Sequence, residues 1–237
     1  MYREFDPPAP LSGAIACFWA RRGDGRDVRV LPDGCADIVW RSGHGAVVAG
    51  PDTAAWLSPT RPGELIVGAR FLPGAGGAAL GLPLSELRNQ RVALPELRLD
   101  RDGQLRDDAE PATALGVLVG MTSALAGDRP PDPAVQAAVA RLLDPSQRID
   151  RLAGELGFSE RQLRRRFLAA VGYGPKTLQR VLRLRRLLAR AAAGDTDSDL
   201  ATAAFDAGYA DQPHLGRECR ALTGLSPREL LVLSNTG

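Results

Sequence analysis

The sequence predicts an α+β protein in two parts: a small, β-rich, barrel-like N-terminal domain that also carries helices, and an all-α C-terminal domain. Three observations lead to this prediction. Short apolar segments punctuated by Gly and Pro occupy the front of the chain, helical periodicity dominates its end, and a Pro-rich stretch separates the two. A chain of 237 residues is also long enough for two modest domains.

Short strands are expected between Cys17 and Phe71. The expected segments are 28–31, 36–41, 46–49 and 65–71. The triplet Pro32-Asp33-Gly34 reads as a turn, because Pro fixes φ and Gly accepts a positive φ. Strands at this spacing indicate a small antiparallel sheet or a barrel.

Helices are expected after this region. Leu80, Leu84 and Leu87 carry helical spacing, and residues 112–126 read as an apolar helix. The Pro-rich stretch that follows cannot continue a helix, because each Pro removes a hydrogen-bond donor. The predicted parts are a sensing or dimerisation domain at 1–127, a linker at 128–133 and a helical domain at 134–237.

Charge is distributed unevenly along the chain. The net charge is −3 over residues 1–144 and +5 over residues 145–237, and residues 161–190 hold ten basic side chains and no acidic one. A basic C-terminal part suggests a nucleic-acid module, with arginines on solvated helix faces as the alternative. The composition, 44% hydrophobic and 24% charged, excludes collagen-like, coiled-coil and wholly disordered chains.

The cysteines Cys17, Cys35 and Cys219 are odd in number and widely spaced, so neither a disulfide framework nor a zinc quartet is expected. We expect no metal and no cofactor. The N-terminus has no apolar segment typical of a signal peptide, and the uncharged stretch 111–127 is short for a membrane span. These features predict a soluble, cytoplasmic protein that is associated with the nucleoid and not with a membrane.

The C-terminal domain contains an internal repeat. In its first copy a short helix with apolar residues at i, i+3, i+4 and i+7 ends at Gly157. Ser159 and Gln162 then form a capping-box pattern at the start of a second helix. The expected buried face of that helix consists of Leu163, Phe167 and Ala170, and Gly172 ends it.

The second copy follows at an offset of 51 or 52 residues. Gly208 corresponds to Gly157, Asp211 is an expected N-cap, and Gly224 corresponds to Gly172. Helix, glycine turn and capped helix together predict a helix-turn-helix motif, here twice. A connecting helix from Pro175 to about residue 192 would be about 25 Å long and could hold two recognition helices roughly one DNA turn apart.

A resemblance supports this interpretation. The residues that carry it are Leu152-Ala153, Gly157-Phe158-Ser159, Leu163, Phe167, Gly172 and Pro175, then Ala203, Gly208-Tyr209-Ala210-Asp211-Gln212, His214, Arg217-Glu218 and Leu222-Thr223-Gly224-Leu225-Ser226-Pro227. With this pattern, residues 132–235 resemble the AraC/XylS-type transcriptional regulators. Cys219 departs from the family, which usually has Phe there. Residues 31–39 and 68–74 resemble a front domain, often fused to such regulators, that has no assigned activity.

The outward positions of the two recognition helices are the candidate DNA-reading residues. They are Arg161, Arg164 and Arg165 on the first helix and Gln212, Pro213, His214 and Arg217 on the second. The resemblance implies base contacts for the three arginines of the first helix. Arginine suits guanine, and glutamine suits adenine. The alternative is that these side chains meet phosphates only.

Other polar residues have simpler interpretations. The arginines of the connecting helix are read as a solvated face: Arg180, Arg183, Arg185, Arg186 and Arg190. A set in the front domain resembles a thiol active site only by residue type: Asp33, Cys35, Asp37 and His44. Trp40 and Trp56 could line a ligand pocket, but core packing is favoured.

The sequence therefore predicts a bacterial-type, sequence-specific transcription regulator rather than an enzyme. Its expected partner is double-stranded promoter or operator DNA. The front domain is expected to bind a small-molecule effector, a second copy of the chain, or both, and the sequence leaves the effector-binding residues unknown. RNA polymerase is an expected partner of the protein if the protein activates transcription. The helix around Leu115, Leu118, Val119 and Leu125 offers a face for the second copy. The alternative is a thiol-based or other enzyme tethered to DNA by its helix-turn-helix tail.

Overall fold

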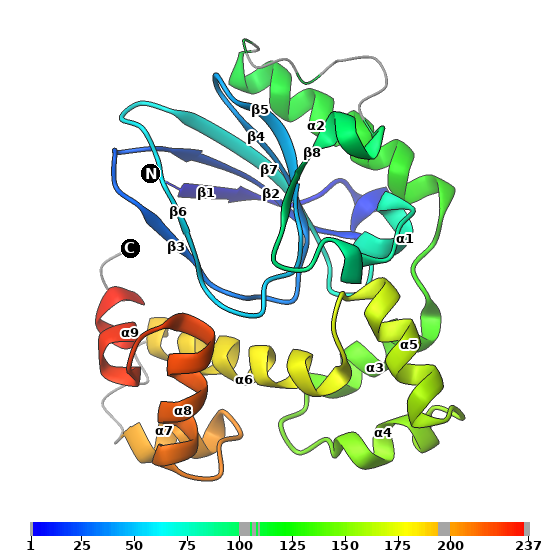
Figure 1. Ribbon diagram of the computed structural model, residues 1–237, viewed down its shortest axis with the longest axis vertical. Coiled ribbons are helices and arrows are strands. Elements are labelled where there is room, and N and C mark those ends of the chain that lie inside the picture. Colours follow the sequence, from blue (N-terminus) through cyan, green and yellow to red (C-terminus); the bar gives the residue numbers. More distant parts are fainter. Residues whose placement is uncertain (1, 100–104, 106–107, 109, 194–199, 235–237) are drawn as a thin grey trace.

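A curved sheet lies above a row of helices that the C-terminal part of the chain forms (Figure 1). The computed structural model describes residues 2–99, 105, 108, 110–193 and 200–234. The long helix α6 (Pro175–Ala192) runs beneath the sheet, with helices clustered at both of its ends. The fold is thus an antiparallel sheet domain followed by a helical domain, as the sequence predicts.

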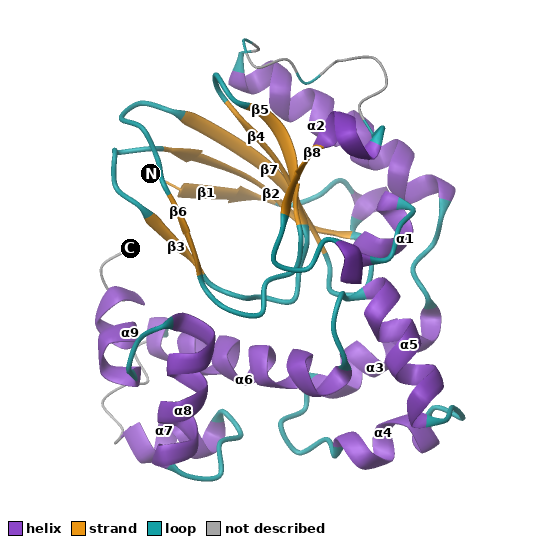
Figure 2. Ribbon diagram, viewed as in Figure 1, coloured by secondary structure: helices purple, strands orange, loops and turns teal. Residues whose placement is uncertain are grey.

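The main sheet has six antiparallel strands in the order β1-β2-β7-β4-β5-β8, and β3 and β6 form a separate two-stranded ribbon (Figure 2). The strands are β1 (Tyr2–Phe5), β2 (Ile15–Arg22), β3 (Val28–Val30), β4 (Asp37–Arg41), β5 (Gly45–Ala49), β6 (Trp56–Ser58), β7 (Leu65–Phe71) and β8 (Arg91–Ala93). Of the two predicted alternatives, the described strands form an open sheet with β1 and β8 at its edges. The four expected strands are confirmed.

One face of the sheet packs on the apolar core of the front domain. Burial alternates along β4, where Ile38 and Trp40 are fully buried, as expected of a strand with one face inward. Helix α2 (Pro111–Asp128) covers this face, and its Leu118 is also fully buried. The core-packing interpretation of Trp40 is therefore confirmed.

A helix through Leu80, Leu84 and Leu87 was a wrong prediction. Helix α1 (Gly76–Leu80) ends at Gly81, which has a left-handed φ of 71°, and a short 3-10 helix η2 (Leu84–Glu86) follows Pro83. The three leucines are nevertheless buried in the core. Helical spacing here reflects burial on two short elements that a glycine and a proline separate. The other 3-10 segments are η1 (Ala9–Leu11) and η3 (Leu94–Leu97).

The helical domain has its own core, which is formed by residues between Val135 and Leu230. Its helices are α3 (Pro133–Leu142), α4 (Ile149–Glu155), α5 (Glu160–Ala170), α6, α7 (Leu200–Asp206), α8 (Gln212–Thr223) and α9 (Pro227–Ser234). The chain leaves α2 at Asp128 and enters α3 at Pro133, which takes the first helical position, where a missing N–H costs nothing.

Candidate nucleic-acid interface

The two helix-turn-helix motifs sit at opposite ends of α6. Helices α4 and α5 form the first and α7 and α8 the second, and the turn glycines Gly157 and Gly208 have φ of 76° and 90°. L-residues with a Cβ rarely adopt this left-handed conformation, so the turns depend on glycine. The predicted repeat is thus present in the structure, with its turns where the sequence places them.

A full capping box starts the first recognition helix, α5. The Ser159 Oγ accepts a hydrogen bond from the Gln162 N–H at 3.3 Å, and the Ser159 N–H donates to Gln162 Oε1 at 2.9 Å. Phe167 is fully buried below the cap, as predicted. This arrangement fixes which side of α5 faces outward.

The predicted reading residues of α5 are all exposed. Arg161, Arg164 and Arg165 point away from the core, and none of them forms an ion pair with a described residue. The neighbouring Arg166 differs, since it pairs with Asp132 at 2.6 Å and lies 4.8 Å above the Phe158 ring. Three guanidinium groups that form no ion pair within the described ranges lie in the N-terminal half of α5, where they are well placed to meet an anionic surface.

The second recognition helix, α8, has Asp211 as its N-cap, and the carboxylate of Asp211 accepts the His214 N–H at 2.6 Å. Gln212, Pro213 and Arg217 are exposed, as predicted. His214 is only half-exposed, because its ring turns toward the protein. The Ala210 N–H donates to its Nδ1 at 3.3 Å, and its Nε2 lies 3.3 Å from Glu218 Oε1.

A buried ionic cluster attaches α8 to α6. Glu218 accepts hydrogen bonds from Arg180 Nε at 3.0 Å and from Arg183 Nη2 at 3.1 Å. Arg186 donates hydrogen bonds to two backbone carbonyls, that of Leu142, the last residue of α3, and that of Ala207, the residue after α7. The interpretation of these arginines as a solvated face is therefore wrong: they hold the helices together.

Of the remaining two arginines of α6, Arg190 is half-buried and Arg185 is exposed, and both have partners. Arg190 pairs with Asp206 at 3.0 Å, and Arg185 lies 3.7 Å from Asp33 in the front domain. The signal that sequence reasoning missed was Glu218, an acidic residue on the inward side of an otherwise apolar helix face.

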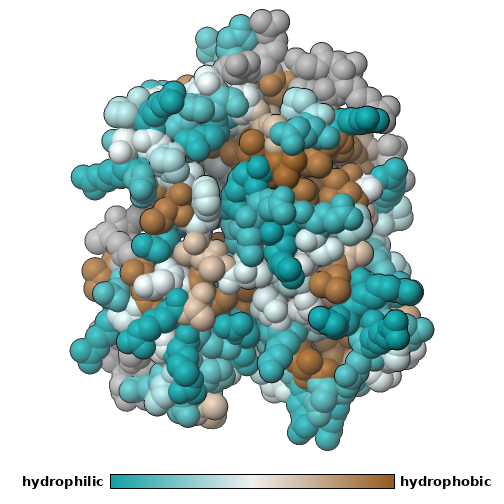
Figure 3. Space-filling view, in the orientation of Figure 1, coloured by the Kyte–Doolittle hydropathy of each residue, from teal (hydrophilic) through white to brown (hydrophobic). Residues whose placement is uncertain are grey.

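Both recognition helices point in the same direction. The N-terminal ends of α5 and α8 lie at the lower edge of the molecule in Figure 1, and their C-terminal ends face the front domain. This lower edge is mostly hydrophilic, and it is hollowed between the two motifs (Figure 3). Recognition helices contact base edges through their N-terminal residues, and the N-terminal ends of both recognition helices lie on this edge.

In the front domain, Asp33, Asp37 and Arg70 form a packed polar network. Arg70 Nε lies 3.2 Å from Asp33 Oδ2 and 3.3 Å from Asp37 Oδ1, and the Trp19 Nε1–H donates to Asp37 Oδ2 at 3.0 Å. Burial raises the pKa of Asp37 to about 6, against the opposing charge of Arg70. The network joins β2, β4 and β7.

The residues that resemble a thiol active site are not assembled as one. Burial raises the pKa of the Cys35 thiol well above its usual value, which disfavours the reactive thiolate. His44 lies in the turn after β4, beside Glu64 at 3.5 Å, whereas Cys35 precedes that strand. The length of β4 therefore separates the thiol from the imidazole.

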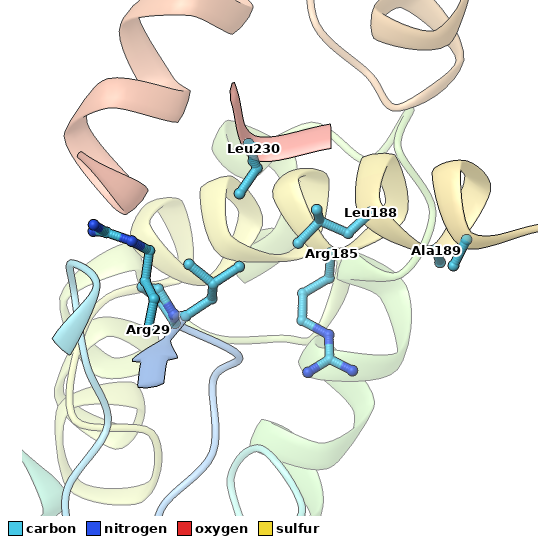
Figure 4. Close-up of a pocket in the computed structure, with 8 residues that line it drawn as sticks. Arg29, Arg185, Leu188, Ala189 and Leu230 are labelled. Atoms are coloured by element: carbon cyan, nitrogen blue, oxygen red, sulfur yellow. The ribbon is translucent and has the colours of Figure 1, made fainter. Parts of the chain in front are cut away.

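A cavity of about 450 Å³ lies between the two domains (Figure 4). It is lined by Arg29, Leu31, Pro32, Arg185, Leu188, Ala189, Ala192 and Leu230. Neither Trp40 nor Trp56 lines it. Trp56 is 46% exposed and stacks beneath Arg91 at 4.9 Å.

Within the described ranges, no group of three or more His, Cys, Asp or Glu side chains is placed to hold a metal ion. None of the helices in the same ranges is long and apolar enough to span a membrane.

Comparisons with known proteins agree with this geometry. Residues 152–231 match the family of the helix-turn-helix domain, and residues 3–93 match a domain of unknown function (DUF6597). No curated protein matches the sequence.

Among solved structures, ToxT from Vibrio cholerae has a similar fold. One structure of it gives a TM-score of 0.51 at 12% identity, covering 92% of this chain and 97% of that one. A second, at 1.65 Å resolution, gives 0.49 at 12% identity, covering 91% and 98%. The chain thus joins a front domain of unknown activity to an AraC-type helix-turn-helix domain, and it is a DNA-binding transcription regulator.

Proposed function

We propose that the protein recognises a specific operator by placing α5 and α8 in two successive major-groove segments on one face of the duplex. The observation that carries this proposal is the common direction of the two capped recognition helices at the ends of α6. With 18 residues, α6 is about 27 Å long, which is compatible with sub-sites one helical turn apart.

The roles of the side chains follow from their chemistry. Arg161, Arg164 and Arg165 are free to bind guanine edges in a bidentate manner, and Gln212 suits adenine. Pro213 offers only an apolar contact, such as one to a thymine methyl group, and Arg217 suits guanine or phosphate. His214 is the weakest of the seven candidates, because both of its ring nitrogens already have protein partners.

The front domain is proposed to regulate this binding, through an effector or a second subunit. Helix α2 is an unsuitable dimer surface, because Leu115, Leu118, Val119 and Leu125 pack against the front-domain core instead. The interdomain cavity has a volume typical of small-ligand sites and is lined by both domains. An effector there would contact α6 and α9 directly.

We further propose that the protein acts without catalysis of its own, in the cytoplasm and on the nucleoid, and contacts RNA polymerase where it activates. The alternative of a DNA-tethered thiol enzyme is disfavoured by the separation of Cys35 from His44 and by the raised pKa of the thiol. Domain limits of 1–127 and 134–237 around a 128–133 linker stay part of this proposal.

Selection of binding sites from random duplex DNA by the full chain tests the proposal, followed by mapping of bound sites in the genome. We expect an enriched sequence with two conserved sub-sites about ten base pairs apart. Recovery of unrelated sequences, or of one sub-site alone, would contradict it.

A further inference from the structure

The front domain contacts the C-terminal end of α8. Arg29 Nη1 donates to the carbonyl oxygen of Thr223 at 2.8 Å, and the Ala55 N–H donates to that of Leu222 at 2.7 Å. The last four carbonyls of a helix have no partner within it, so these bonds satisfy two orphan acceptors of α8. The Arg29 cation is also favoured at the negative end of the helix dipole.

The front domain also contacts the C-terminal end of α5. A Cβ on Gly77 of α1 would overlap the carbonyl oxygen of Ala169. A Cβ on Gly172, the residue that closes the first motif, would lie 2.5 Å from Pro51 Cγ and 3.0 Å from the Leu84 carbonyl oxygen. The front domain therefore packs directly on the backbone at the C-terminal end of α5, through the backbone of Gly77 and Leu84 and the ring of Pro51.

The two contacts are equivalent in the internal repeat. Gly172 and Gly224 occupy matching positions at an offset of 52 residues, and their φ values are 89° and 75°. A third contact lies between them, where Asp33 Oδ2 approaches Arg185 Nη1 of α6 at 3.7 Å. One domain thus touches the same end of both recognition helices and the helix that joins them.

We propose that the front domain is a brace that sets the spacing and tilt of the two recognition helices, with Arg29 and Gly77 as positioning residues. Helix α8 has 12 residues and is about 18 Å long, so a movement of its C-terminal end tilts the N-terminal end that meets DNA. Helix α6 holds α8 along one side, through Glu218, and the brace holds its end. The preferred distance between operator sub-sites is then a property of both domains.

This inference rests on the proposed two-point reading of DNA, and its test uses the full chain. The operator obtained by selection is rebuilt with one base pair removed, unchanged, or with one or two base pairs added between the sub-sites. Binding is titrated for the wild type, Arg29→Ala, Gly77→Ala and the control Arg22→Ala. Arg22 is an exposed arginine of β2, so its removal changes the charge of the front domain equally.

We expect the wild type to prefer one spacing. Arg29→Ala should reduce that preference by about threefold to tenfold, which is within the range that one charge-assisted hydrogen bond can supply. Gly77→Ala should reduce it as well, and Arg22→Ala should leave it unchanged. A merely stabilising contact would lower affinity for all spacings alike, so the ratio between spacings is the deciding quantity.

If Arg29→Ala and Gly77→Ala keep the wild-type ratio of affinities between operator spacings, the brace is overturned and the two-point reading stays intact. An equal loss in Arg22→Ala would overturn it too, since the cause would then be net charge. A wild type that binds all spacings equally would overturn the two-point reading and the brace together. If Gly77→Ala fails to fold, as judged by circular dichroism, Arg29→Ala decides alone.

Discussion

The carboxylate of Glu218 lies 3.1 Å from the guanidinium of Arg183, Oε1 to Nη2, and this pair joins the second recognition helix to α6. Arg180, also on α6, completes the cluster with its Nε 3.0 Å from the same carboxylate oxygen. Glu218→Gln removes the charge but keeps the shape, and it leaves two partly buried cations without a counter-charge. We expect a loss of about 1–3 kcal/mol in the free energy of unfolding, measured by urea denaturation.

Glu96→Gln is the matched control, because Glu96 is exposed in η3. We expect it to change the free energy of unfolding by less than about 0.5 kcal/mol. A Glu218→Gln variant as stable as this control would show that the cluster contributes no net stability.

The exposed arginines of α5 give the second prediction. Arg164→Ala or Arg165→Ala should each weaken binding to the selected operator by about 1–3 kcal/mol and relax the preference at one base pair. Fluorescence anisotropy on the operator and on its single-base variants measures both effects. Arg151→Ala, on the exposed face of α4, is the control. An equal loss on random DNA would indicate contacts to phosphates only.

Local chemistry explains why so much of the helical domain could be predicted. Ser159 and Gln162 form a capping box, and the left-handed turns after α4 and α7 are occupied by Gly157 and Gly208, so short-range rules place the helix ends. The buried face of α5 follows from helical spacing, and the structure confirms it. Once the buried positions of α5 are assigned, the other positions of the helix must face outward, and these include the arginines predicted to contact DNA.

Partners distant in sequence could not be predicted in this way. Arg186 donates to Leu142, 44 residues earlier, and Arg29 to Thr223, 194 residues later. Nothing in an arginine's local sequence distinguishes a solvated face from a buried contact. The strands β1, β2, β6 and β8 were not among the expected segments. Of these, β1, β6 and β8 have only three or four residues each and depend on pairing with their neighbours.

A spacing change in the operator gives the third prediction. Inserting five base pairs between the sub-sites moves the second one about half a turn around the duplex, to a face that α8 cannot reach. We expect specific binding to be nearly abolished, as measured by gel shift against the unmodified operator. Insertion of a full turn should also weaken binding, because the rigid α6 cannot lengthen. Unchanged affinity in both would mean that a single motif reads the DNA.

The fourth prediction concerns pH. Burial raises the pKa of Asp37 from 3.8 to about 6, so between these values the folded protein binds a proton that the unfolded chain does not. The contribution of this group to stability therefore rises as the pH falls through that window. Asp37→Asn does not titrate, so the wild type should gain stability relative to the variant between about pH 7 and about pH 4. A constant difference between their urea denaturation midpoints would contradict the raised pKa.

The last prediction concerns the separated helical domain. Residues 132–237 hold an apolar core from Val135 to Leu230, and among the described residues of the front domain only the partly buried Leu31 packs against it. We expect this fragment to fold and to bind the operator, and to lose either dimerisation or a ligand response. Sedimentation and binding titrations on the fragment and the full chain, with and without metabolite extracts, measure these properties. The same mass state, the same affinity and no ligand response in both proteins would refute a regulatory front domain.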